Sequence, residues 1–136
     1  MDPLGRFVAA QEQVYPRALA ELRAGQKRSH WMWFVFPQIA GLGLSAMAQL
    51  YAIVDRAEAE AYLAHPLLGP RLSDCTDALL GWAGHRTAEA ILGPVDALKL
   101  CSSMTLFEAA GGSPHFTEVL DAFYEGQRDP QTLSRL

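Results

Sequence analysis

The two lysines of the chain, Lys27 and Lys99, are the first candidates for a chemical role. They stand among 11 basic residues, and each lies where a polar segment meets an apolar one. A lysine ammonium is a compact point charge whose pKa burial can lower, and an arginine guanidinium does not replace it. We interpret both positions as requiring an amine. Chance placement of two lysines is the alternative.

The first of these segments runs from Lys27 through Arg28 and Ser29 to His30 and is strongly polar. If Ser29 caps a helix, the exposed N–H groups of the next turn attract anions. We therefore predict that Lys27, Arg28 and Ser29 bind a phosphate or carboxylate group. Gln38, at the far end of the longer block 27–38, is expected to contact the same ligand.

Aromatic side chains follow at once in the segment 31–36. Trp31 and Trp33 could stack on a planar ring of the ligand. They could equally belong to the core, with their indole N–H groups donating to carbonyl oxygens. For Phe34 and Phe36 we expect the core.

The second polar segment contains Asp96, Lys99 and Ser103, which share one face of a helix at spacings i, i+3 and i+7. A serine and a desolvated lysine can act as nucleophile and base. The alternative is an Asp96–Lys99 ion pair, with the hydroxyl groups bonding the preceding turn. The residues that we predict to be catalytic are Lys99, Ser102, Ser103 and His30, and Asp96 and Thr105 are predicted ligand contacts.

Three blocks of the chain resemble a known family: residues 25–38 with 41–43, residues 62–69, and residues 96–107. The pattern Lys-x-Ser-His-Trp-Met-Trp-Phe begins at Lys27, and Lys-x-x-Ser-Ser-x-Thr-Leu-Phe begins at Lys99. These blocks are similar to the small bacterial family catalogued as domain of unknown function eighteen-ten, sometimes mislabelled calpastatin. The resemblance implies a compact, mostly helical domain and brings no activity with it. Residues 61–68 show a weaker similarity to helical domains of NAD and ADP-ribose metabolism.

The elements that must position these side chains are helices. Apolar residues recur at spacings of three and four, and period-two alternation is nowhere sustained. We predict one all-α domain over residues 1–136, with about seven helices and short loops. The expected helical segments are 3–24 with a break at Pro16, 31–36, 45–53, 56–64, 67–82, 87–92, 94–110, 114–124 and a short C-terminal turn.

Composition narrows the choice of partners. The net charge is −4, which argues against duplex nucleic acid because neutralising phosphates needs a basic surface. The uncharged stretch 31–54 contains a proline and two glycines, so we expect a buried segment and no membrane span. No signal peptide is recognisable, and the cysteines and histidines have no metal-site spacing, so we expect a cytoplasmic protein without metal or cofactor.

These observations favour a small anionic ligand. We expect the chain to bind a phosphorylated, nucleotide-like molecule, related to NAD or ADP-ribose, and to cleave it, if at all, by hydrolysis of a glycosidic bond. The alternative is a protein-interaction module that uses the aromatic block Trp31–Phe36 as a partner or dimer face.

Overall fold

The computed structural model describes residues 2–136. Four of its helices are capped at the N-terminus by a side chain. The Asp55 carboxylate accepts a hydrogen bond from the Glu58 N–H at 2.9 Å, and the Thr87 hydroxyl accepts one from the Ala90 N–H at 3.0 Å. Ser45 and Asp129 cap the helices that follow them in the same way. N-capping depends on residues only two or three positions apart, so caps such as these can be recognised in the sequence.

The prediction of an all-α fold is confirmed, but the predicted number of about seven helices is wrong, because residues 2–136 form ten. The expected first helix splits, and Pro16 lies in the first turn of its second half, where a missing N–H costs nothing. Four further helices are only four or five residues long. In chain order the ten are α1 (Gly5–Gln11), α2 (Tyr15–Arg23), α3 (Met32–Val35), α4 (Ala46–Leu50), α5 (Arg56–Ala64), α6 (Leu68–Leu80), α7 (Ala88–Leu92), α8 (Pro94–Ala109), α9 (His115–Tyr124) and α10 (Pro130–Ser134).

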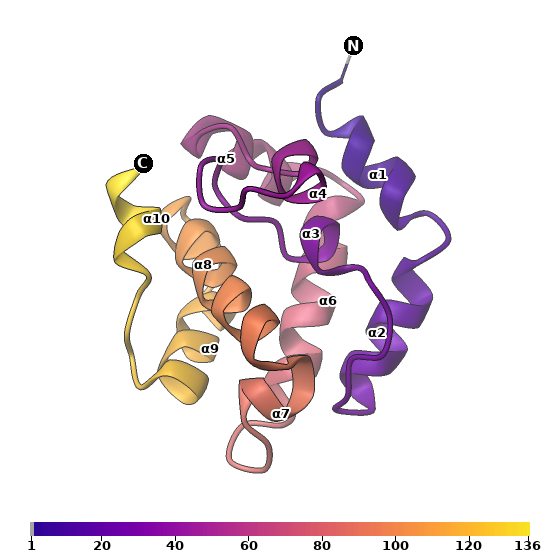
Figure 1. The fold of residues 1–136 in the computed structure, drawn as a ribbon, viewed down its shortest axis with the longest axis vertical. Coiled ribbons are helices and arrows are strands. Elements are labelled where there is room, and N and C mark those ends of the chain that lie inside the picture. Colours follow the sequence, from indigo (N-terminus) through magenta and orange to yellow (C-terminus); the bar gives the residue numbers. More distant parts are fainter. Residues whose placement is uncertain (1) are drawn as a thin grey trace.

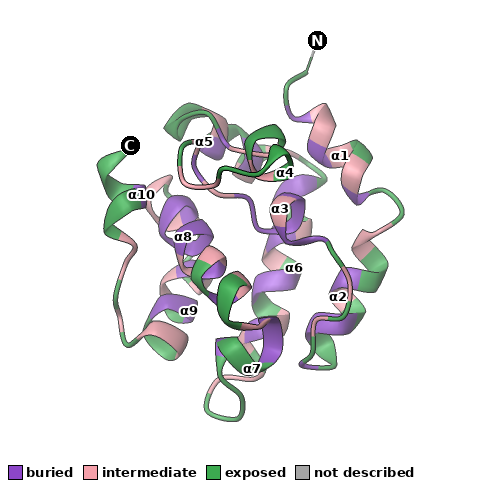
Figure 2. Ribbon diagram, in the orientation of Figure 1, coloured by how far each residue is buried: buried purple, intermediate pink, exposed green. Residues whose placement is uncertain are grey.

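Helices α6 and α8 form the centre of the molecule (Figure 1). Helix α6 packs against α2, α5 and α9, and α8 packs against α5, α7, α9 and α10. A series of aromatic rings connects these helices. The ring centroid of Tyr62 lies 5.2 Å from those of Phe7 and Phe107, and the centroids of Phe107 and Phe116 are 5.9 Å apart. Figure 2 shows the buried faces of these helices turned toward this one core.

The segment between α3 and α5 has little helix but a defined course. The Ile53 N–H donates to the Gln38 carbonyl and the Ala40 N–H donates to the Ile53 carbonyl, both at 2.8 Å, which makes a single parallel bridge. This bridge fixes the backbone at Gln38, although Gln38 lies outside a helix. None of the helices in residues 2–136 has the length and apolar composition needed to cross a bilayer.

Candidate functional site

The two lysines meet at one carboxylate. The Lys27 ammonium lies 2.9 Å from Asp96 Oδ2, and the Lys99 ammonium lies 3.7 Å from Asp96 Oδ1. Helix α8 supplies Asp96 and Lys99 one turn apart, and the loop after α2 supplies Lys27. The two polar segments found in the sequence therefore meet in space, joined by an ion pair that the sequence alone could not establish.

Each lysine also lies over a tryptophan ring. Lys27 Nζ is 5.3 Å from the centre of the Trp31 ring, and Lys99 Nζ is 5.4 Å from that of Trp33. The three ion-paired side chains are only 12%, 17% and 26% exposed for Lys27, Asp96 and Lys99. Two ammonium groups and one carboxylate leave a surplus positive charge, and partial burial makes an anion an effective partner for it.

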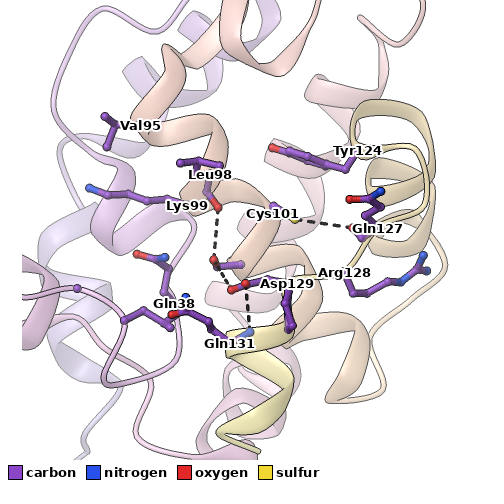
Figure 3. Close-up of a pocket in the computed structure, with 14 residues that line it drawn as sticks. Gln38, Val95, Leu98, Lys99, Cys101, Tyr124, Gln127, Arg128, Asp129 and Gln131 are labelled. Carbon is purple, nitrogen blue, oxygen red and sulfur yellow. Dashed lines mark hydrogen bonds between the residues drawn. The ribbon is translucent and has the colours of Figure 1, made fainter.

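A groove of about 590 Å³ opens beside this cluster, between α8 and the segment from α9 to α10. Figure 3 shows Lys99 and Gln38 on one side, Tyr124, Gln127 and Arg128 on the other, and Asp129 between them. The remaining lining residues are Leu42, Gly43, Val95, Leu98, Cys101, Ser102, Pro130 and Gln131. Apolar and amide side chains thus line the groove together with the charged groups of Lys99, Arg128 and Asp129.

The groove's second cation, Arg128, is already neutralised. Its guanidinium donates to both Glu108 carboxylate oxygens, at 2.9 Å and 2.5 Å, and lies 3.4 Å from Asp121. The hydrogen bond from Arg128 lowers the pKa of Glu108, so this pair stays ionised. Lys99 is therefore the groove-lining cation that has charge to offer a ligand.

Ser102 and Thr105 hold the wall of the groove together. The Ser102 hydroxyl lies 2.8 Å from Asp129 Oδ2, and the Thr132 hydroxyl donates to the same oxygen at 2.6 Å. The Thr105 hydroxyl donates to the Cys101 carbonyl and accepts from the Asp129 N–H. These two predicted site residues thus attach α10 to α8.

Asp129 is a poor base for activating Ser102. Burial acts to raise the pKa of its carboxyl group, but the hydrogen bonds from Thr132, Ser102 and the Gln131 backbone outweigh burial and lower it. A carboxylate with a lowered pKa holds protons weakly. Ser103, the other predicted nucleophile, is fully buried and its hydroxyl has no partner within residues 2–136, so no substrate reaches it.

The expected anion site at Arg28 and Ser29 is filled by the protein itself. Glu21 Oε1 accepts from the N–H groups of Arg28 and Ser29 at 2.7 Å and 3.1 Å and from the Trp31 indole N–H at 2.9 Å, and Oε2 accepts from the Ser29 hydroxyl at 2.6 Å. Ser29 therefore caps no helix, and α3 begins three residues later. The backbone N–H groups of Arg28 and Ser29 and the Ser29 hydroxyl are thus already paired with Glu21, whereas the Arg28 guanidinium bonds the Gln26 side chain and faces solvent.

The aromatic block lies in the core. Trp31 has no exposed surface, and Met32, Phe34, Val35 and Phe36 are also buried. Trp31 therefore cannot stack on a ligand, and the block cannot form the partner face proposed as the alternative function. Trp33 is the half-buried exception, beneath Lys99. Arg28 and His30 are exposed and do not line the groove.

Several residues of the site were not found from the sequence. Tyr124, Gln127, Arg128, Asp129 and Gln131 form one wall of the groove, and only the packing of α10 against α8 brings that wall opposite Lys99. Glu21 did carry a signal. It lies on the same face of α2 as Ala18 and Leu22, and a carboxylate on an apolar helix face needs donors when buried.

Comparison with known proteins agrees with this fold. A family model described as "Protein of unknown function (DUF1810)" matches residues 1–136. The crystal structure of the conserved hypothetical protein Rv1873 from Mycobacterium tuberculosis is similar, with a TM-score of 0.95 and 51% sequence identity over 99% of this chain and 98% of that one. No match was found among curated proteins. The resemblance recognised in the sequence blocks is confirmed.

Proposed function

The chain belongs to the family described as protein of unknown function DUF1810, and we propose from its own side chains that it binds a small phosphorylated, nucleotide-like molecule. Derivatives of NAD and ADP-ribose are members of this class. The observation that carries the proposal is the surplus positive charge of the Lys27–Asp96–Lys99 cluster, of which Lys99 lines the groove. A phosphate at Lys99 neutralises that surplus.

The shape and lining of the groove support the same ligand class. Its volume of about 590 Å³ falls within the usual range of roughly 300–1,000 Å³ for small-molecule sites. Leu98 is 73% exposed there and, with the ring of Tyr124, offers apolar surface to a planar base. The amide groups of Gln38, Gln127 and Gln131 both donate and accept hydrogen bonds, as the edge of a base requires.

Thermal-shift measurements with nucleotides, NAD, ADP-ribose and sugar phosphates test the proposal. At about 100 times Kd, a ligand adds about 2.7 kcal/mol to the free energy of unfolding and raises Tm by several degrees. We expect Lys99→Met to abolish the shift with little loss of stability, because the Lys99–Asp96 pair is long and partly exposed. Arg17→Met removes the same charge from an exposed position on α2 and serves as the control.

Replacing Asp96 reverses the sign of the expected effect. Asp96→Asn removes the carboxylate that competes with the ligand for both lysines, so anion affinity should rise, roughly tenfold at low salt. Calorimetric titration of each variant with the best ligand measures this change. Unchanged affinity in both Lys99→Met and Asp96→Asn contradicts the proposed site.

Cleavage of a glycosidic bond is the reaction expected for this ligand class if binding leads to turnover. Incubating the protein with each ligand that raises Tm, followed by chromatography of the products, tests it directly. Intact ligand after prolonged incubation limits the function to binding.

A further inference from the structure

A second group of reactive side chains lies outside the groove, where α6 meets the start of α9. Ser113 Oγ lies 3.0 Å from His115 Nε2, and His115 Nδ1 lies 3.1 Å from Asp77 Oδ1. Asp77 belongs to α6, His115 is the first residue of α9, and Ser113 lies in the turn before it. The imidazole thus stands between a hydroxyl and a carboxylate.

The Asp77 carboxylate determines which atom donates the proton in each of these two hydrogen bonds. Ionised Asp77 can only accept, so His115 Nδ1 carries the proton. In the neutral imidazole, Nε2 is then an acceptor, and the Ser113 hydroxyl donates to it. A nucleophile, a base and a carboxylate that orients the base are therefore linked in the order that a serine hydrolase requires.

The base is held firmly while the nucleophile faces solvent. The His115 side chain is only 12% exposed, and its ring meets the ring of buried Phe116 edge-on, with centroids 4.3 Å apart. A side chain at Gly112 would overlap the Phe116 ring, so the turn before α9 is packed tightly. Ser113 itself is exposed, so an acyl group can reach the hydroxyl directly.

In the described part of the chain, two backbone N–H groups beside the Ser113 hydroxyl are free of backbone acceptors. Among the backbone hydrogen bonds of residues 2–136, none uses the N–H of Ser113 or of His115. Both groups lie at the N-terminal end of α9, where the helix dipole favours negative charge. Pro114 has no N–H, so the residue after the nucleophile provides no donor, and this restricts the site to reactive acyl groups.

We propose that Ser113, His115 and Asp77 form a catalytic triad that hydrolyses small carboxylic esters. Ser113 Oγ bonds to the ester carbonyl carbon while its proton moves to His115 Nε2. The bond to the alcohol oxygen then breaks, the alcohol leaves with that proton, and an acyl-serine remains. Water attacks the acyl carbon and gives a proton to Nε2, and Ser113 Oγ departs and recovers the proton. Ester and water become acid and alcohol, and Asp77 orients the imidazole throughout.

Labelling with a fluorophosphonate probe tests the proposal on the full chain. We expect the probe to modify Ser113, located by peptide mass spectrometry, and p-nitrophenyl acetate to be hydrolysed at a rate that Ser113→Ala reduces to the background. Ser134→Ala is the matched control, because Ser134 is an exposed serine whose hydroxyl donates to a backbone carbonyl and has no imidazole partner. Absence of labelling at Ser113, or equal loss in the Ser134 control, overturns the proposal.

Asp77 separates a catalytic arrangement from a merely structural one. Its side chain is 63% exposed, so Asp77→Asn should leave Tm unchanged while lowering the labelling rate about tenfold or more, and Asp77→Glu should restore part of it. His115→Gln should lower the rate by about a hundredfold. A labelling rate that follows only Tm across these variants makes the cluster a tie between α6 and α9 and overturns the proposal. Neither result depends on the groove, because Ser113 does not line it.

Discussion

The Glu21 carboxylate is the side chain on which the course of residues 28–31 depends. Burial acts to raise its pKa, but the hydrogen bonds from Ser29, Arg28 and Trp31 outweigh burial and lower the pKa from 4.5 to about 2. The ionised form is therefore favoured in the folded state. The contribution of ionised Glu21 to the free energy of unfolding is fully present above about pH 4.5 and is lost as the pH falls toward 2.

Replacing this carboxylate tests its contribution. Glu21→Gln replaces an acceptor oxygen by an amide N–H group, which then faces the N–H groups that donated to the carboxylate. We expect a loss of about 2–4 kcal/mol in the free energy of unfolding at pH 7. Urea unfolding at several pH values measures it. The variant should also lose much of the decline in stability between about pH 5 and pH 2 that the wild-type chain shows.

Glu60→Gln is the control for this experiment, because Glu60 is exposed on α5. It should change neither the stability at pH 7 nor its dependence on pH. An equal pH dependence in Glu21→Gln and the wild-type chain would show that the Glu21 hydrogen bonds do not carry this stability.

At the scale of elements, α5 and α6 approach each other through a glycine. Gly69, in the first turn of α6, is buried, and a Cβ there would overlap the Leu63 carbonyl oxygen. The overlap is with backbone, which cannot move aside as a flexible side chain does. Gly5, in α1, has no atom within 4 Å of the place where its Cβ would lie.

The same substitution should therefore act oppositely in the two helices. We expect Gly69→Ala to destabilise the fold by about 1–3 kcal/mol because α5 and α6 must separate. Gly5→Ala should stabilise it by roughly 0.5 kcal/mol, since alanine loses less backbone entropy. Chemical denaturation of both variants provides the comparison, and equal effects would show that the α5–α6 contact tolerates a side chain.

For the whole molecule, local signals were sufficient to predict the all-α fold class, although not the number of helices. Asp55, Thr87 and Asp129 cap the helices predicted to follow them, and Pro16 marks the break between α1 and α2. These features depend on residues close in sequence. The predicted proximity of Asp96 and Lys99 held for the same reason, because one helical turn brings them together.

What the sequence could not provide is the pairing of distant residues. The meeting of Lys27 with Asp96, the wall around Asp129 opposite Lys99, and the approach of Asp77 to His115 each depend on how helices pack. The burial of Phe34 and Phe36 was predicted, but that of Trp31 was not. An aromatic run followed by a proline is compatible with a core or with a binding face, and packing alone placed Trp31 inside.

The position of α10 has a practical consequence. Pro130 and Gln131 line the groove, so the carboxyl end of the chain lies only a few residues from the candidate ligand site. Helix α1, the first helix of the chain, lies on the opposite side of the molecule from α10 (Figure 1). A purification tag joined after Leu136 would crowd the entrance, whereas one at the amino end leaves it open. For the same reason, a fluorophore attached at the carboxyl end would report the arrival of a ligand.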